Sequence, residues 1–198
     1  MARDASSILC QPGELIWGAT DLSIASPHGG NSLGWTKDGV RFFHGIDTRN
    51  VLSEENGVAI QEIIYLGANI RMSATLQQWD DNVLARVFPN TDTGGTSGEK
   101  VVEFPGDSLT PGGKMSTLGG VLVFSPTDLT NNKVILFRNA VPVANLGDSF
   151  FMGTSKDTEM AVIFKGLPDS SIPSSGDARY ASRTGAIGDR RDLTIAAP

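Results

Sequence analysis

The chain has 198 residues, a formal net charge of −6 and one cysteine, Cys10, so it cannot contain an intramolecular disulfide. No apolar run reaches the roughly 18 residues of a membrane-spanning helix, so we expect no membrane association. The first residues lack the apolar stretch of a secretory signal peptide, so we expect no export by the secretory route. The net negative charge argues against a protein that binds nucleic acid tightly through a basic surface.

The negative charge is concentrated in one half of the sequence. Residues 1–99 contain six basic and twelve acidic residues, whereas residues 100–198 contain ten of each. Two interpretations are open, namely a solvated surface or a surface that repels an anionic molecule.

Strand signals begin near the start of the chain. Glu14–Gly18 is short and apolar, and Val40–His44 follows the sequence Lys37-Asp38-Gly39. Because Asp-Gly between apolar runs is typical of a tight turn, we expect a hairpin at this point.

Two more strands are expected on either side of the break Gly67-Ala68-Asn69. These are Gln61–Leu66 and Ile70–Leu76, and the second alternates apolar and polar residues as a half-buried strand does. Four further strands are predicted at Val101–Phe104, Gly120–Phe124, Lys133–Phe137 and Glu159–Phe164.

One helix is predicted around residues 76–88. Its apolar residues recur at helical spacing and form one stripe for core packing: Leu76, Trp79, Val83, Leu84, Val87 and Phe88. Asp80 and Asp81 lie early in this helix, where its dipole favours anions, and Pro89 ends it.

Glycine, proline and serine mark the remaining segments. Residues 90–120 form a glycine-rich insertion, and residues 169–198 are small, polar and expected to form an extended C-terminal arm rather than a core element. The sequence therefore predicts one all-β domain over residues 1–168, a β-sandwich or barrel with one flanking helix.

Signals for catalysis are weak. The two histidines, His28 and His44, show no metal-binding spacing, and Cys10 has no nearby histidine to activate it. No glycine-rich phosphate-binding motif occurs. We therefore expect a protein without catalytic, metal or cofactor residues, whose glycine-rich loops suit close contacts between subunits.

Residues 13–89 contain a recurring pattern of turn residues and apolar spacing. It comprises Gly18, Thr20, Asp21, Leu22, Leu33, Gly34, Gly39, Val40, Asn50, Val51, Gly57, Leu76, Trp79 and Leu84. This pattern resembles the major tail tube protein family of tailed bacteriophages. The segment 161–169 also resembles the last core strand of that family. The resemblance covers about half of the chain and includes no catalytic signature.

This resemblance implies a structural virion protein. Such proteins form hexameric rings that stack into a hollow tube, through which viral DNA passes without tight binding. The implied partners are other copies of the chain and other tail proteins, namely tape measure, terminator, baseplate or sheath. The implied location is the virion, and the host cytoplasm during assembly. A loop at Gly45–Gly57 is the candidate for contact between rings, with Gly45, Asp47, Arg49, Asn50, Leu52, Glu55 and Gly57 as its residues.

The charge asymmetry then suggests an acidic lumen that repels DNA phosphates. The candidate lumen carboxylates are Asp38, Asp47, Glu54, Glu55 and Glu62, some of which could pair between subunits with Arg41, Arg49 or Arg71. The C-terminal arm contains Arg179, Arg183, Arg190 and Arg191, which either dock on the acidic half of a neighbouring subunit or belong to a solvated tail.

Two alternatives remain open at this stage. The first is another ring or surface protein of the virion, namely a tail terminator, a head-to-tail connector or a capsid decoration protein. The second is a carbohydrate-binding β-sandwich, possibly a hydrolase, which would need exposed aromatic side chains. Trp17 and Trp79 are expected in the core, which leaves Trp35 as the one exposed indole.

Overall fold

The fold is described from a computed structural model of the chain. It describes residues 13–23, 28–53, 59–77, 81–88, 91–94, 101–103, 106–107, 109–126, 133–144, 159–167, 185–189 and 195. No helix within these stretches has the length and apolar character needed to cross a membrane.

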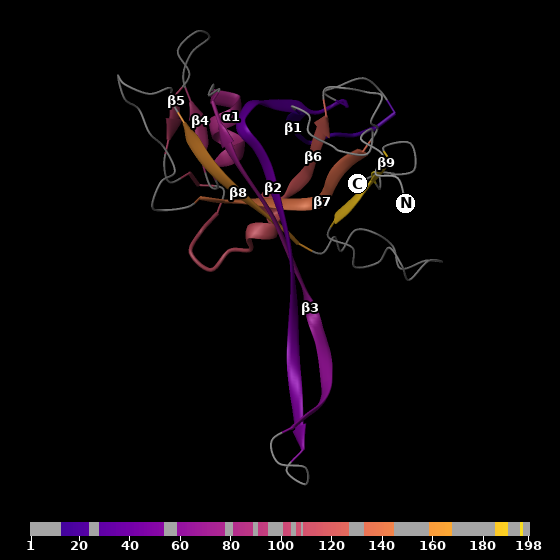
Figure 1. The fold of residues 1–198 in the computed structure, drawn as a ribbon. Coiled ribbons are helices and arrows are strands. Elements are labelled where there is room, and N and C mark those ends of the chain that lie inside the picture. The colour runs from indigo at the N-terminus through magenta and orange to yellow at the C-terminus, as the bar shows by residue number, and fades with distance from the viewer. Residues whose placement is uncertain are drawn as a thin grey trace, which may run out of the picture.

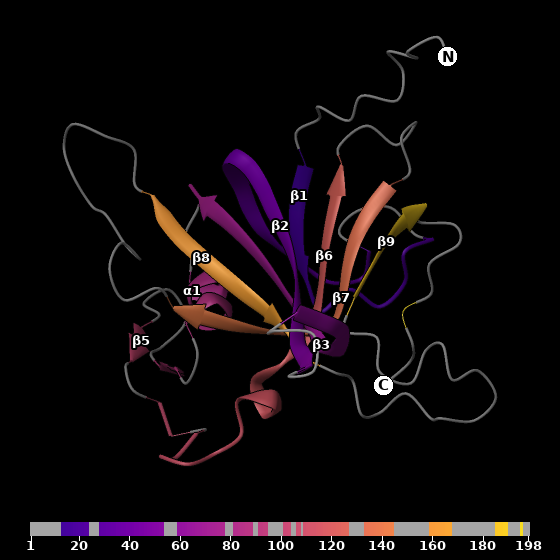
Figure 2. The ribbon, with the colours of Figure 1, turned by 60° about the horizontal axis from the view of Figure 1, so that its bottom comes forward.

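Six antiparallel strands close into a β-barrel, as the all-β prediction anticipated. They are β1 (Gly13–Trp17), β2 (Asn31–Ser53), β3 (Ala59–Leu76), β6 (Gly120–Pro126), β7 (Lys133–Ala144) and β8 (Met160–Gly166). The strand order is β6-β1-β2-β3-β8-β7, and pairing of β7 with β6 closes the circle. Figures 1 and 2 show these strands surrounding a common interior, with β2 and β3 continuing far beyond it.

The barrel interior is filled by the inward residues of all six strands. Leu15, Met72, Leu122, Phe137 and Phe164 are fully buried there. Trp17 is part of the same cluster and its ring lies 5.8 Å from that of Phe164, which confirms its predicted place in the core.

A second apolar cluster covers the outside of β1, β6 and β7. Ile16, Val123 and Leu136 point away from the barrel interior and are fully buried beneath Ala19 and Leu22 of the turn after β1. These three strands are therefore apolar on both faces, whereas the outer faces of β2, β3 and β8 remain open to solvent.

The turn that covers this second cluster is held by hydrogen bonds around His28. The backbone N–H groups of Thr20 and Asp21 donate to the His28 carbonyl, and His28 Nε2 lies 3.1 Å from Ser125 Oγ. The Ser23 backbone N–H donates to Asp21 Oδ1 at 2.8 Å, and this bond lowers the pKa of the Asp21 carboxyl. His28 is fully buried, and its contacts hold this turn against β6.

The hairpin predicted at Lys37-Asp38-Gly39 is wrong. These residues lie inside β2, which runs without a turn for 23 residues. Lys37 pairs with Thr75 and Val40 pairs with Ala74, so Asp38 and Gly39 are two extra residues that bulge out of the strand. Both have positive φ, which is why the local sequence resembles that of a turn.

Gly39 is required for this bulge by its backbone conformation alone. It has a φ of +75°, and a Cβ placed there would meet nothing within 4 Å. Gly39→Val should lower the free energy of unfolding by about 1–2 kcal/mol, because a side chain is strained at positive φ. Gly67→Val is the matched control, since Gly67 also faces open space but has no positive φ, and urea denaturation of both variants compares them. Equal stability of the two variants would contradict the prediction.

The break predicted at Gly67-Ala68-Asn69 is also absent. β3 runs as one strand of 18 residues through these positions. Asp47 pairs with Gly67 and Thr48 pairs with Tyr65, so Leu66 is one extra residue in β3. The two expected strands are therefore one strand with a bulge.

The single predicted helix is confirmed, but it is shorter than the apolar stripe suggests. Helix α1 covers Asp81–Val87 and buries Val83 and Val87 in the main cluster. Leu76 belongs to the end of β3 rather than to the helix, and Trp79 lies outside the described residues.

Within the glycine-rich insertion at residues 90–120 the strand predicted at Val101–Phe104 is confirmed, and two further elements were not expected. Strand β4 (Asp92–Gly94) pairs with β5 (Val101–Glu103) in a separate two-stranded sheet, and a short 3₁₀ helix, η2, covers Met115–Leu118.

Part of the C-terminal segment joins the barrel. Strand β9 (Gly185–Asp189) pairs with residues 133–137 of β7, as Figure 2 shows, and Ile195 packs on the second apolar cluster. The sequence reading missed β9 because its five residues include two glycines.

Candidate protein-binding surface

The most exposed element of the fold is the extension of β2 and β3 beyond the barrel, called here the ribbon, which comprises residues 45–53 and 59–69. In Figure 1 it projects downward from the barrel as an isolated two-stranded arm. Nine residues of β2 at about 3.3 Å each give it a length of roughly 30 Å.

The ribbon has two free edges. β8 pairs with β3 only from Arg71 to Leu76, and β1 pairs with β2 only from Asn31 to Trp35. Among the described residues neither strand has another neighbour beyond those points, so a row of backbone N–H and C=O groups on each edge has no strand beside it.

One face of the ribbon is mostly apolar, with Thr48 and Asn50 as its polar residues on β2. The register of β2 and β3 places five large side chains on the face that continues from the barrel interior: Ile46, Leu52, Ile60, Ile63 and Tyr65. Each of them is between 53 and 62% exposed. This set is called the apolar face, and it is the candidate contact site of the described surface, because exposed apolar patches are typical of surfaces that bind another molecule.

The opposite face of the ribbon carries its charges. Asp47, Arg49 and Glu62 alternate with the residues of the apolar face and are all exposed. Nearest the barrel on this side, the guanidinium of Arg71 lies 5.5 Å from the centre of the Phe43 ring.

The predicted lumen carboxylates are only partly brought together. Asp47 and Glu62 share the charged face of the ribbon with Arg49, whereas Asp38 lies in the bulge of β2 inside the barrel wall. Glu54 and Glu55 lie outside the described residues. The acidic lumen therefore stays a prediction.

The loop expected at Gly45–Gly57 is largely strand. Gly45, Asp47, Arg49, Asn50 and Leu52 all lie in β2, because the strand continues to Ser53. Glu55 and Gly57 fall outside the described residues, as do Arg179, Arg183, Arg190 and Arg191 of the predicted arm. The described part of this region is thus an antiparallel two-stranded element, and its contact role stays a prediction.

Sequence reasoning missed the apolar face, because Ile46 and Leu52 were assigned to a loop and only Ile63 and Tyr65 were expected in a strand. The sequence of β3 contains an unbroken apolar run, Ile63-Ile64-Tyr65-Leu66. This run hides the alternation of side chains between the two faces of the ribbon. The bulge at Leu66 shifts that alternation by one residue, so the face of each side chain follows only from the pairing with β2.

No three of the described His, Cys, Asp or Glu residues are placed to hold a metal ion. Trp35 is 73% exposed, which confirms the expected exposed indole. No protein-family model matches the chain, and no curated protein matches it.

Proposed function

We propose that this protein is the major tail tube subunit of a tailed bacteriophage. Six copies form a ring, and rings stack into a tube through which viral DNA passes. Its partners are other copies of itself and the tape measure, terminator, baseplate or sheath proteins of the tail. It acts in the virion, is assembled in the host cytoplasm and has no catalytic activity.

The observation that supports this proposal is the ribbon. A two-stranded hairpin that stands alone in water is marginally stable, and this one exposes both edges and five large apolar side chains. Each feature favours a partner that buries the apolar face or pairs with an edge. In a tube of identical subunits that partner is another copy of the chain.

The shape of the subunit favours stacking over a closed pair. The ribbon and the barrel are different surfaces, so a ribbon that docks on the barrel of another copy makes a head-to-tail contact. Such contacts repeat from copy to copy, because each docked subunit still offers its own ribbon. This is the behaviour that a tube requires.

An acidic lumen is part of the proposal. Asp47 and Glu62 lie on the charged face of the ribbon, and repetition around a ring would multiply their charge. Phosphates would be repelled from such a wall, so the DNA would slide through it without being held.

Imaging of the purified protein by negative-stain electron microscopy tests the function. We expect long tubes of uniform diameter whose length grows with protein concentration. Single rings would favour a tail terminator or head-to-tail connector, and monomers at high concentration would contradict the tube proposal. Monomers that bind a capsid lattice would instead identify a decoration protein.

A second candidate is supported by one observation, the exposed indole of Trp35. An aromatic ring on a β-sheet surface is a typical platform for a sugar ring. Binding on a glycan array that Trp35→Ala abolishes would support a carbohydrate-binding protein instead.

A further inference from the structure

Three basic side chains gather on the outer surface of β2, β3 and β8, although the chain as a whole has a net charge of −6. The strand register aligns Phe43, Arg71 and Lys165 in one row across the three strands. In the next row, Arg41 of β2 stands opposite Ser73 of β3. Neither row contains a carboxylate. Arg41, Arg71 and Lys165, together with Ser73, are called here the cationic patch.

The three cations are close enough to act on one ligand. Residues directly opposite each other on antiparallel strands have Cβ atoms about 5 Å apart, and diagonal neighbours are about 7–8 Å apart. Arg71 stands directly opposite Lys165 and is the diagonal neighbour of Arg41. All three residues are exposed and have long side chains, so their charged ends can reach one anion placed over Ser73.

The charges of the cationic patch are not neutralised by the residues that the structure describes. None of the three cations forms an ion pair there, whereas Lys37, farther along β2, pairs with Glu159. The Arg71 guanidinium lies 5.5 Å from the centre of the Phe43 ring, a contact that leaves its charge uncompensated. Like charges directly opposite each other destabilise a sheet, and Arg71 and Lys165 are such a pair. An anion that bridges them would remove this repulsion.

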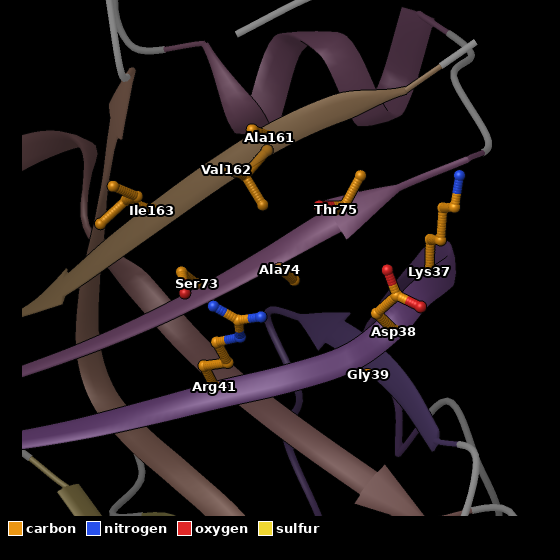
Figure 3. A pocket seen from close by; sticks show the side chains of 10 residues that line it. All are labelled: Lys37, Asp38, Gly39, Arg41, Ser73, Ala74, Thr75, Ala161, Val162 and Ile163. Atoms are coloured by element: carbon orange, nitrogen blue, oxygen red, sulfur yellow. The ribbon is translucent and has the colours of Figure 1, made fainter. Parts of the chain in front are cut away.

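A pocket beside the cationic patch gives an anion room to bind. It has a volume of about 320 Å³, and Arg41, Ser73 and Ile163 are among the residues that line it. Figure 3 shows the Arg41 side chain extending over β3 toward Ser73. Asp38, the one carboxylate in the lining, lies on the other side of the pocket with Lys37. The Ser73 hydroxyl forms no hydrogen bond with a described residue, so it can donate one to an anion.

We propose that the cationic patch binds a phosphate group, either as free phosphate or in the backbone of a nucleic acid. A phosphate offers several acceptor oxygens and up to two negative charges, and the planar guanidinium of arginine matches its geometry. A single carboxylate carries one charge and would leave two of the three cations uncovered. The patch lies on the barrel, apart from Asp47 and Glu62 of the ribbon, and the inference does not depend on the proposed function.

Titration calorimetry at pH 7 and constant ionic strength tests the proposal. Sodium phosphate should bind the unchanged protein saturably, and sodium acetate should bind at least tenfold more weakly. Arg41→Gln with Lys165→Gln should weaken phosphate binding at least tenfold, because two of the three cations are removed. A short single-stranded oligothymidine without terminal phosphates distinguishes the two sources. Binding tighter than that of phosphate, and lost in the same variant, identifies a nucleic acid backbone, whereas binding of phosphate alone identifies free phosphate.

A matched control removes two exposed cations elsewhere on the described surface. Lys114→Gln with Lys133→Gln should bind phosphate as the unchanged protein does, and circular dichroism verifies that each variant is folded. Lys165→Gln alone provides a second measurement. It should raise the Tm in phosphate-free buffer by about 1–3 °C, because it relieves the repulsion from Arg71. Phosphate should then raise the Tm of this variant less than that of the unchanged protein.

Four results would overturn the inference. The first is the absence of saturable binding of both phosphate and oligothymidine to the unchanged protein. The second is phosphate binding that Arg41→Gln with Lys165→Gln leaves unchanged, or that the control variant weakens equally. The third is acetate binding as tight as phosphate binding, which would identify a carboxylate as the ligand. The fourth is a lower Tm of Lys165→Gln in phosphate-free buffer. None of these results depends on whether the protein forms tubes, so the proposed function is tested separately.

Discussion

Ile60→Asp combined with Ile63→Asp should abolish self-association of the subunit and leave its barrel folded. Both side chains lie on the apolar face and are more than half exposed in the single subunit, so a carboxylate there costs the monomer little. Burial of each isoleucine at a contact contributes about 1.5–3 kcal/mol, and loss of both reduces association by more than about a hundredfold. Sedimentation velocity and electron microscopy measure the effect, while circular dichroism verifies the fold.

The neighbouring residue provides the control for this prediction. Ile64 is 43% exposed but lies on the charged face of the same strand, opposite Arg49. Ile64→Asp should weaken association less than tenfold, whereas Ile63→Asp alone should weaken it well beyond that. Equal effects of the two substitutions would show that the apolar face is not the contact surface.

Phe137→Ala should remove much of the stability of the barrel. Phe137 is fully buried and lies where β6, β7 and β9 meet, with its ring 5.9 Å from that of Phe42 in an edge-to-face arrangement. Loss of a buried phenylalanine side chain costs about 3–5 kcal/mol, through lost burial and the cavity it leaves. Domains of this size are stable by only about 5–15 kcal/mol, so the loss is a large fraction of the total.

Urea denaturation measures this change best in a background that does not self-associate, because assembly would add its own stabilisation. The Ile60→Asp, Ile63→Asp protein provides that background. Phe43→Ala is the control, since Phe43 is 43% exposed and should cost less than about 1 kcal/mol. A loss below about 1 kcal/mol for Phe137→Ala would contradict the described core.

The fold class followed from the sequence because apolar runs and their alternation report burial directly. Ile70, Met72, Ala74 and Leu76 were placed on one face of a strand, and all four are buried in the barrel. The helix was also identified, since Val83 and Val87 recur at helical spacing and pack on the core.

The length of β2 and β3 could not be predicted from local sequence. Asp38-Gly39 has the composition of a hairpin turn, and only its pairing partners distinguish a bulge from a turn. Lys37 and Val40 are held against Thr75 and Ala74 on β3, so the chain continues straight where its local sequence favours reversal. The candidate surface depends on this long-range pairing. The sequence therefore indicated its two halves separately, as a loop at Gly45–Gly57 and a strand at Gln61–Leu66.

The bulges of the ribbon also affect how readily two copies of the protein can pair through their exposed strand edges. Flat ribbons with open edges and an apolar face stack readily into cross-β aggregates. The register of β2 and β3 shifts after Asp47 and again after Val51, and each shift increases the local twist. Two ribbons twisted in this way cannot align edge to edge over their full length. The irregularities therefore oppose edge-to-edge pairing of two ribbons.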